Sequence, residues 1–141
     1  MTGSGGIDWS RVSEHAGPHA SPGFRFWRDF MRWQRRLNEL LRPLGLTQPQ
    51  FAILATIGWL SKENAEVEQQ DLSDFLGLER MHVSQVVSRL ERQGAISRRR
   101  SENDARANVI ALTEEGVGLL SSSIPIVEDF DHSFFAGRSS G

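Results

Sequence analysis

The feature that most constrains the fold is a pair of helical patterns that meet at a glycine. The first pattern predicts a helix of about two turns, with apolar residues at Leu72, Phe75 and Leu76. The second predicts a longer helix whose inner face holds Val83, Val86, Val87 and Leu90. Gly77 supplies the turn between them. Two helices joined by a turn that contains glycine are typical of a helix-turn-helix.

The second of these helices leaves seven side chains pointing outward or sideways. They are Arg80, Met81, His82, Ser84, Gln85, Ser88 and Arg89. A DNA major groove admits an α-helix and is read chiefly by residues near the helix N-terminus. We therefore predict that these seven residues contact DNA and that the first five set its sequence preference. Leu78 is expected to pack on Val83 as a hydrophobic staple.

The pattern changes from helical to extended after Gly94. Residues 95–100 and 107–112 form two extended patterns on either side of a polar stretch, 101–106. This arrangement predicts a hairpin with a charged tip. A hairpin directly behind a recognition helix is the wing of a winged helix-turn-helix.

Positive charge is concentrated in the same region. Residues 80–106 hold seven arginines against three acidic residues, a local net charge of +4 in a chain whose formal net charge is −2. A basic patch on an acidic body is typical of a DNA-binding surface, although an ordinary solvated surface also fits. Arg98, Arg99 and Arg100 either meet phosphates or charge an edge strand against aggregation. Arg106 is long and flat enough to enter a narrow minor groove.

Two further helices are predicted before the helix-turn-helix. Ser21-Pro22 begins the first and Pro43 ends it. Its apolar stripe is wider than one core needs and contains Phe26, Trp27, Phe30, Met31, Trp33, Leu37, Leu40 and Leu41. Thr47 and Gln50 match a capping box that begins the second helix, over 48–60. Most of its core is expected to come from Phe51, Ile53, Leu54, Ile57 and Trp59.

A bent helix is predicted after the hairpin, with Thr113 as its cap and Pro125 within it. Its later part is expected to present Val127, Phe130 and Phe134. If they were exposed together with Phe26, Phe30 and Trp33, the apolar patch would be larger than monomers usually tolerate. We therefore predict that these six residues form the interface of a homodimer.

These elements together predict a mainly α fold with a small β-hairpin wing, which is a winged helix-turn-helix with N- and C-terminal dimerisation helices. The first 21 residues are rich in Gly, Ser, His and Pro and are expected to be flexible, with one short helix that Asp8 begins and Gly17 ends. The predicted divisions are an arm over 1–21, a dimerisation helix over 22–46, a DNA-binding domain over 47–112, a second dimerisation helix over 113–137 and a tail over 138–141.

The order and spacing of these motifs resemble the MarR family of bacterial transcriptional regulators. The resemblance spans roughly residues 24–137, and its most specific part is Asp104-Ala105-Arg106 in the wing followed by Leu112-Thr113-Glu114-Glu115-Gly116. It implies a homodimer, most simply a repressor, that binds a pseudo-palindromic operator and is often released by a small, commonly aromatic ligand. It also implies that Asp104 orients Arg106.

The sequence departs from the family pattern in two places. Glu79 stands where the family usually has a serine or threonine cap, which brings an acidic side chain close to the expected phosphates. The chain given ends at Gly141, where the family usually continues into a sixth helix that completes the dimer.

The resemblance places effectors between the dimerisation helices and the DNA-binding domain. There, an aromatic set either surrounds a pocket or belongs to the core: Trp27, Phe30, Trp33, Phe51 and Trp59.

Several classes of protein do not fit the sequence. The absence of cysteine excludes a disulfide scaffold and a thiol switch, and the four scattered histidines predict no catalysis, metal or cofactor. No apolar run approaches the roughly 20 residues needed to cross a bilayer. The N-terminus lacks the features of a secretion signal, so we expect a cytoplasmic protein. The alternative to a DNA-binding regulator is a protein-interaction module that keeps the fold without operator binding.

Overall fold

The computed structural model describes residues 6–137 of the 141-residue chain. The chain divides into two compact units, with the boundary between Arg36 and Leu37. The first five residues of the predicted arm and the whole predicted tail, 138–141, lie outside the described residues. Each unit is described by itself below.

The first unit contains short helices and most of one long helix. The short elements are α1 (Trp9–Val12) and the 3-10 helix η1 (Pro18–Ala20), and the long one is α2 (Pro22–Leu41). α2 begins where Ser21-Pro22 predicts. α1 ends at Val12, earlier than the predicted stop at Gly17, because Ser13 is already extended. The Asp8 carboxylate accepts a bond from the Ser10 hydroxyl at 2.6 Å and makes no cap bond to the backbone.

The second unit begins with the end of α2, the 3-10 helix η2 (Arg42–Leu44) and α3 (Gln48–Leu60). Thr47 and Gln50 form the predicted capping box at the start of α3. Ile53, Leu54 and Ile57 are fully buried. The prediction of a core position for Trp59 is wrong, because its side chain is 58% exposed. Trp59 lies two residues beyond Ile57, which turns it away from the buried face of the helix.

The helix-turn-helix is present as predicted. The 3-10 helix η3 (Lys62–Asn64) and the strand β1 (Val67–Glu68) lead into α4 (Gln69–Leu76), which is followed by α5 (Arg80–Arg92). Gly77 joins α4 to α5 with φ +71°, a left-handed conformation that glycine adopts without strain. α4 and α5 both pack on α3, with Leu72, Val83, Val87 and Leu90 fully buried.

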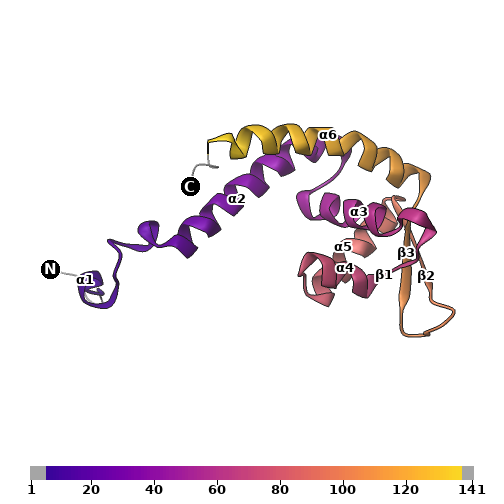
Figure 1. Ribbon diagram of the computed structural model, residues 1–141, viewed down its shortest axis with the longest axis horizontal. Helices are drawn as coiled ribbons and strands as arrows, with labels where there is room; N and C mark the ends of the chain where they lie inside the picture. The colour runs from indigo at the N-terminus through magenta and orange to yellow at the C-terminus, as the bar shows by residue number, and fades with distance from the viewer. Residues whose placement is uncertain (1–5, 138–141) are drawn as a thin grey trace. The chain divides into compact units, whose positions relative to one another are not determined.

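The predicted hairpin is formed by β2 (Ile96–Arg100) and β3 (Asn108–Leu112). β1 pairs with β3 on the side opposite β2. The antiparallel sheet therefore has the order β1-β3-β2, and β2 is an edge strand. The hairpin extends past the helices of the second unit (Figure 1). It is therefore a wing beside α5.

The last helix, α6 (Glu114–Ala136), runs without interruption past Pro125. Its apolar face corrects one prediction, because Val127 and Phe130 are 6% and 7% exposed within the single chain and do not present themselves to a partner. Phe134 is half-buried, with its ring centroid 5.4 Å from that of Phe130. An apolar helix face packs within its own chain wherever that chain can cover it.

The junction between the wing and α6 explains the Leu-Thr-x-x-Gly motif. The Thr113 hydroxyl donates to the Gly94 carbonyl at 2.6 Å and accepts the Gly116 N–H at 3.1 Å, while the Thr113 N–H donates to the Ala95 carbonyl. A Cβ placed on Gly116 would lie 2.0 Å from the Ala95 oxygen. Thr113 therefore caps α6 and anchors it, and Gly116 allows the two backbones to approach.

None of the helices within residues 6–137 is long and apolar enough to span a membrane.

Candidate nucleic-acid interface

The start of α5 presents a polar, exposed surface. Arg80, His82 and Gln85 are exposed, and Met81 is 72% exposed. Glu79 occupies the N-cap position and its side chain makes no cap bond. Arg89, one turn further along, is also exposed and lines a groove, whereas Ser84 and Ser88 are half-buried. The first turns of α5 are therefore accessible to a ligand as large as a DNA groove.

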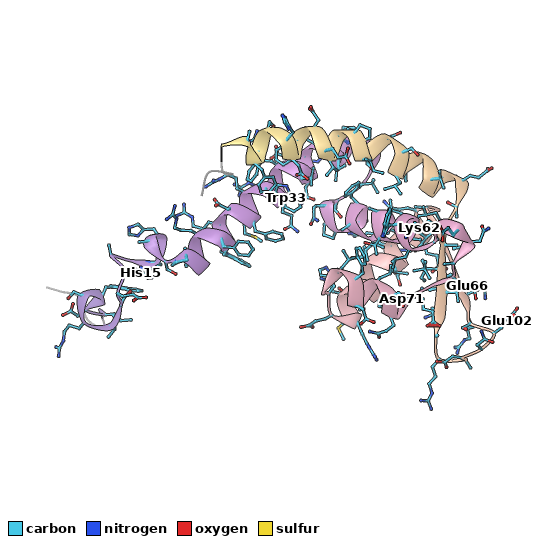
Figure 2. The ribbon with its side chains drawn as sticks, viewed as in Figure 1. His15, Trp33, Lys62, Glu66, Asp71 and Glu102 are labelled. Atoms are coloured by element: carbon cyan, nitrogen blue, oxygen red, sulfur yellow. The ribbon has the colours of Figure 1, made fainter. Side chains whose placement is uncertain are left out.

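A groove of about 450 Å³ lies between α4 and the wing. Residues distant in the sequence meet in it, since Arg80 begins α5 and Arg106 lies in the wing tip. The groove is lined by Glu68, Gln69, Gln70, Ser73, Arg80, Asp104, Arg106, Ala107 and Asn108. Asp71, labelled in Figure 2, fixes the start of α4 because its carboxylate accepts the Glu68 N–H at 2.8 Å. The fold therefore joins the wing arginine and the first residue of the recognition helix in one polar surface.

A second groove, of about 400 Å³, lies on the α3 side of α5. Its lining is Thr47, Pro49, Gln50, His82, Gln85, Val86, Arg89 and Arg92. Arg92 is absent from the DNA contacts predicted above. It lies three residues after Arg89, and this helical spacing is the signal in the sequence that indicates a shared face. The exposed side of α5 is thus bordered by a groove on each side.

The wing tip is ordered by Asp104, but not through the guanidinium of Arg106. The Asp104 carboxylate accepts the backbone N–H of Arg106 at 2.9 Å, and its carbonyl accepts the N–H of Ala107. A guanidinium N–H of Arg100 donates to the Ala105 carbonyl at 2.5 Å. Figure 2 labels Glu102 in the same tip. Asp104 therefore shapes the turn that carries Arg106.

The three consecutive arginines of β2 have different surroundings. Arg98 is partly buried and pairs with Glu91 of α5 at 2.9 Å. Arg99 is exposed and pairs with Glu66, which precedes β1. Arg100 bonds to the wing backbone. Alternation along the strand sends Arg98 and Arg99 to opposite faces of the sheet, so the triplet is not one continuous cationic surface.

The predicted aromatic pocket is not assembled within either unit. Trp27, Phe30 and Trp33 belong to the first unit, and Phe51 and Trp59 to the second. Phe30 and Trp33 contact each other, with ring centroids 5.8 Å apart. The Lys62 ammonium lies 3.9 Å from the centre of the Trp59 ring, as a cation-π contact. An aromatic effector site in this set stays a prediction.

The part of the chain that the structure describes contains no candidate metal site. Within residues 6–137 no group of three or more His, Asp or Glu side chains is placed to hold a metal ion. His82 instead lines the groove between α3 and α5. Its position on the exposed side of α5 favours contact with a nucleic acid.

Known proteins share both the sequence and the fold. The profile of the MarR family matches residues 46–107. The chain is 36% identical over 130 residues to the uncharacterized HTH-type transcriptional regulator YdcH of Bacillus subtilis (strain 168), covering 92% of this chain and 87% of YdcH. It is 31% identical over 102 residues to the transcriptional repressor MprA of Escherichia coli (strain K12), covering 72% of this chain but 57% of MprA. The crystal structure of a MarR mutant from E. coli complexed with operator DNA has the same fold, with a TM-score of 0.75, 22% identity, and coverage of 94% of this chain and 87% of that one.

Proposed function

The chain belongs to the MarR family, and from this premise we propose that it is a sequence-specific DNA-binding transcriptional regulator in which α5 reads a major groove. The observation that carries the proposal is the convergence of Arg80 and Arg106 in one groove beside the exposed start of α5. Side chains at the start of a helix read base edges, while a wing arginine suits the adjacent minor groove. The relative YdcH is named a transcriptional regulator, and MprA is named a repressor. Repression is therefore the form of regulation that we propose.

The proposed contacts fall into two classes. Base reading belongs to the exposed first turns of α5, at Arg80, Met81, His82, Ser84 and Gln85. Phosphate and minor-groove contacts belong to Arg89, which lines the groove beside α3, and to the exposed Arg100 and Arg106 of the wing. Phosphate contacts position the protein on the duplex, whereas base contacts specify its sequence.

Salt dependence is the experiment that tests this function against the interaction-module alternative. The affinity of the parent protein for a duplex selected from a random pool is measured between 50 and 200 mM salt, the interval in which about six to ten phosphate contacts cost a factor of roughly 10³–10⁵. We expect a steep, linear fall of log K with log salt concentration. Salt-independent or undetectable binding would reject DNA binding in favour of the interaction module.

Gln85 is expected to read a base. Its exposed amide is able to pair in two places with an adenine edge, a contact worth about 1–3 kcal/mol of discrimination. A base-substitution scan of the selected site with the Gln85→Ala variant should therefore show relaxed preference at one position in each half-site. Identical preference profiles for parent and variant would show that Gln85 is not a reader.

Asp104 is expected to act through the shape of the wing tip. In Asp104→Ala the acceptor for the Arg106 N–H is lost, so we expect weaker DNA binding even though a negative charge is removed. Asp104→Asn keeps a side-chain oxygen as acceptor and removes the same charge, so it should bind at least as well as the parent. Fluorescence anisotropy on the selected duplex measures both variants. Tighter binding by Asp104→Ala would contradict the role in the turn.

We also propose that the protein works as a homodimer, with α2 in the interface. Phe26 and Trp27 are 75% and 57% exposed on this helix, and Phe30 is 38% exposed. Two recognition helices must lie about 34–36 Å apart to read successive major grooves, which a dimer provides. Sedimentation at micromolar concentration should give a dimer for the parent and a larger monomer fraction for Phe26→Ser. A monomer that binds a single half-site would reject the dimer.

Release by a small aromatic ligand and a cytoplasmic location stay predictions. The residues predicted for the ligand are the five aromatic side chains named above. Quenching of tryptophan fluorescence by simple aromatic acids, followed by a DNA-release assay, tests the first of these predictions.

A further inference from the structure

Arg98 bonds to both helices of the helix-turn-helix. It leaves β2 as the first of the three wing arginines, and one guanidinium nitrogen donates to Glu91 Oε1 at 2.9 Å and to Ser88 Oγ at 3.3 Å. The other terminal nitrogen lies 3.5 Å from Gln69 Oε1. Ser88 and Glu91 belong to α5, and Gln69 is the first residue of α4. One side chain thus connects the wing with both helices.

The surroundings of Arg98 differ from those of a phosphate-binding arginine. Its side chain is 24% exposed, and its charge is matched by the Glu91 carboxylate. Arg106, by contrast, is exposed and its guanidinium has no hydrogen-bond acceptor or ion-pair partner within residues 6–137. A guanidinium presents several N–H donors in a fixed plane, which suits it to join several acceptors at once. A partly buried ion pair with further hydrogen bonds fixes geometry more effectively than an exposed pair does.

We propose that Arg98 is a positioning residue, which holds the wing at a fixed place against the recognition helix and does not contact DNA phosphates. The inference rests on the proposed DNA-binding function. Its consequence is that Ser88 and Glu91 serve the same connection from the α5 side. The wing then holds Arg106 at a fixed position relative to α5. The reason is that β2 cannot shift along α5 without breaking the Arg98 bonds to two helices.

Charge-preserving substitution separates positioning from phosphate contact. A lysine at a phosphate contact keeps the cation and most of the binding, whereas one ammonium cannot reproduce the planar fork that joins three acceptors. For Arg98→Ala we expect Kd for the selected duplex to rise about tenfold at every salt concentration, with the parental slope of log K against log salt. We expect Arg98→Lys to bind as weakly as Arg98→Ala. Arg106→Ala provides the comparison for a lost phosphate contact.

The proposal is overturned if Arg98→Lys binds with parental affinity, if Arg98→Ala lowers the salt slope by about one, or if neither variant changes Kd. A measurement without DNA separates these results from failure of the proposed function. Urea unfolding midpoints are compared for Arg98→Ala, Glu91→Ala and the double variant. We expect the double variant to unfold near the midpoint of the less stable single variant. Strictly additive shifts would show that the two side chains do not act together, and would overturn the connection even if the parent bound no DNA.

Discussion

Gly116→Ala is expected to lower the free energy of unfolding by about 2–3 kcal/mol. Its added methyl group would lie 2.0 Å from the Ala95 carbonyl oxygen, and the obstacle is backbone, which cannot rotate away as a side chain can. Relief requires α6 to move away from the wing, which strains the bonds of Thr113 to Gly94 and Ala95. Urea denaturation followed by circular dichroism measures the change.

Gly118→Ala is the matched control for this substitution. Gly118 lies in the same helix two residues later, and a Cβ placed there meets nothing within 4 Å. Alanine is favoured over glycine within a helix by about 0.5–1 kcal/mol, so this variant should be slightly more stable than the parent. Equal stability of the two variants would contradict the steric explanation of the Leu-Thr-x-x-Gly motif.

Arg106→Ala is expected to weaken DNA binding about tenfold and to lower the salt slope by about one. The reason is the loss of an exposed cation that the wing tip holds beside Arg80 in the groove. Because the contact is electrostatic, the loss should be nearly uniform across operator sequences at the positions that α5 reads. Anisotropy titrations of parent and variant between 50 and 200 mM salt provide the measurement.

The control for Arg106 is another exposed arginine that is not among the predicted DNA contacts. Arg11→Ala removes the same charge from α1, in the first unit, and should change neither the slope nor the affinity by more than about a factor of two. If both variants lower the slope equally, the effect comes from net charge and the wing contact is refuted.

Much of the fold was predictable because its signals are local. The capping box of Thr47 and Gln50, the turn at Gly77 and the strands on either side of the wing tip each depend on neighbouring residues. The outward side of α5 follows from helical periodicity once its inner face is known. These features place the candidate DNA-binding surface before any tertiary contact is considered.

The role of each charged side chain was decided by tertiary structure. Arg98, Arg99 and Arg100 are equivalent in the sequence, but only the packing of β2 beside α5 gives Arg98 its bonds to Ser88 and Glu91. Asp104 is close to Arg106 in the sequence, but which of its groups the carboxylate bonds to depends on the shape of the tip. A pairwise contact depends on distance and direction in space, which residue type and spacing do not fix.

The burial of apolar helical residues was likewise predicted only in part by the sequence and was decided by the tertiary structure. Trp59 and Phe130 both occupy apolar helical positions, yet Trp59 is 58% exposed and Phe130 is 7% exposed. Helical spacing indicates that an apolar face needs a partner, but it does not say whether that partner is the same chain, a second copy or a ligand. The sequence by itself therefore determined the helix-turn-helix, the wing and the charge they carry. Only the tertiary structure decided which side chains remain available for binding, because availability depends on what the folded chain has already covered or paired.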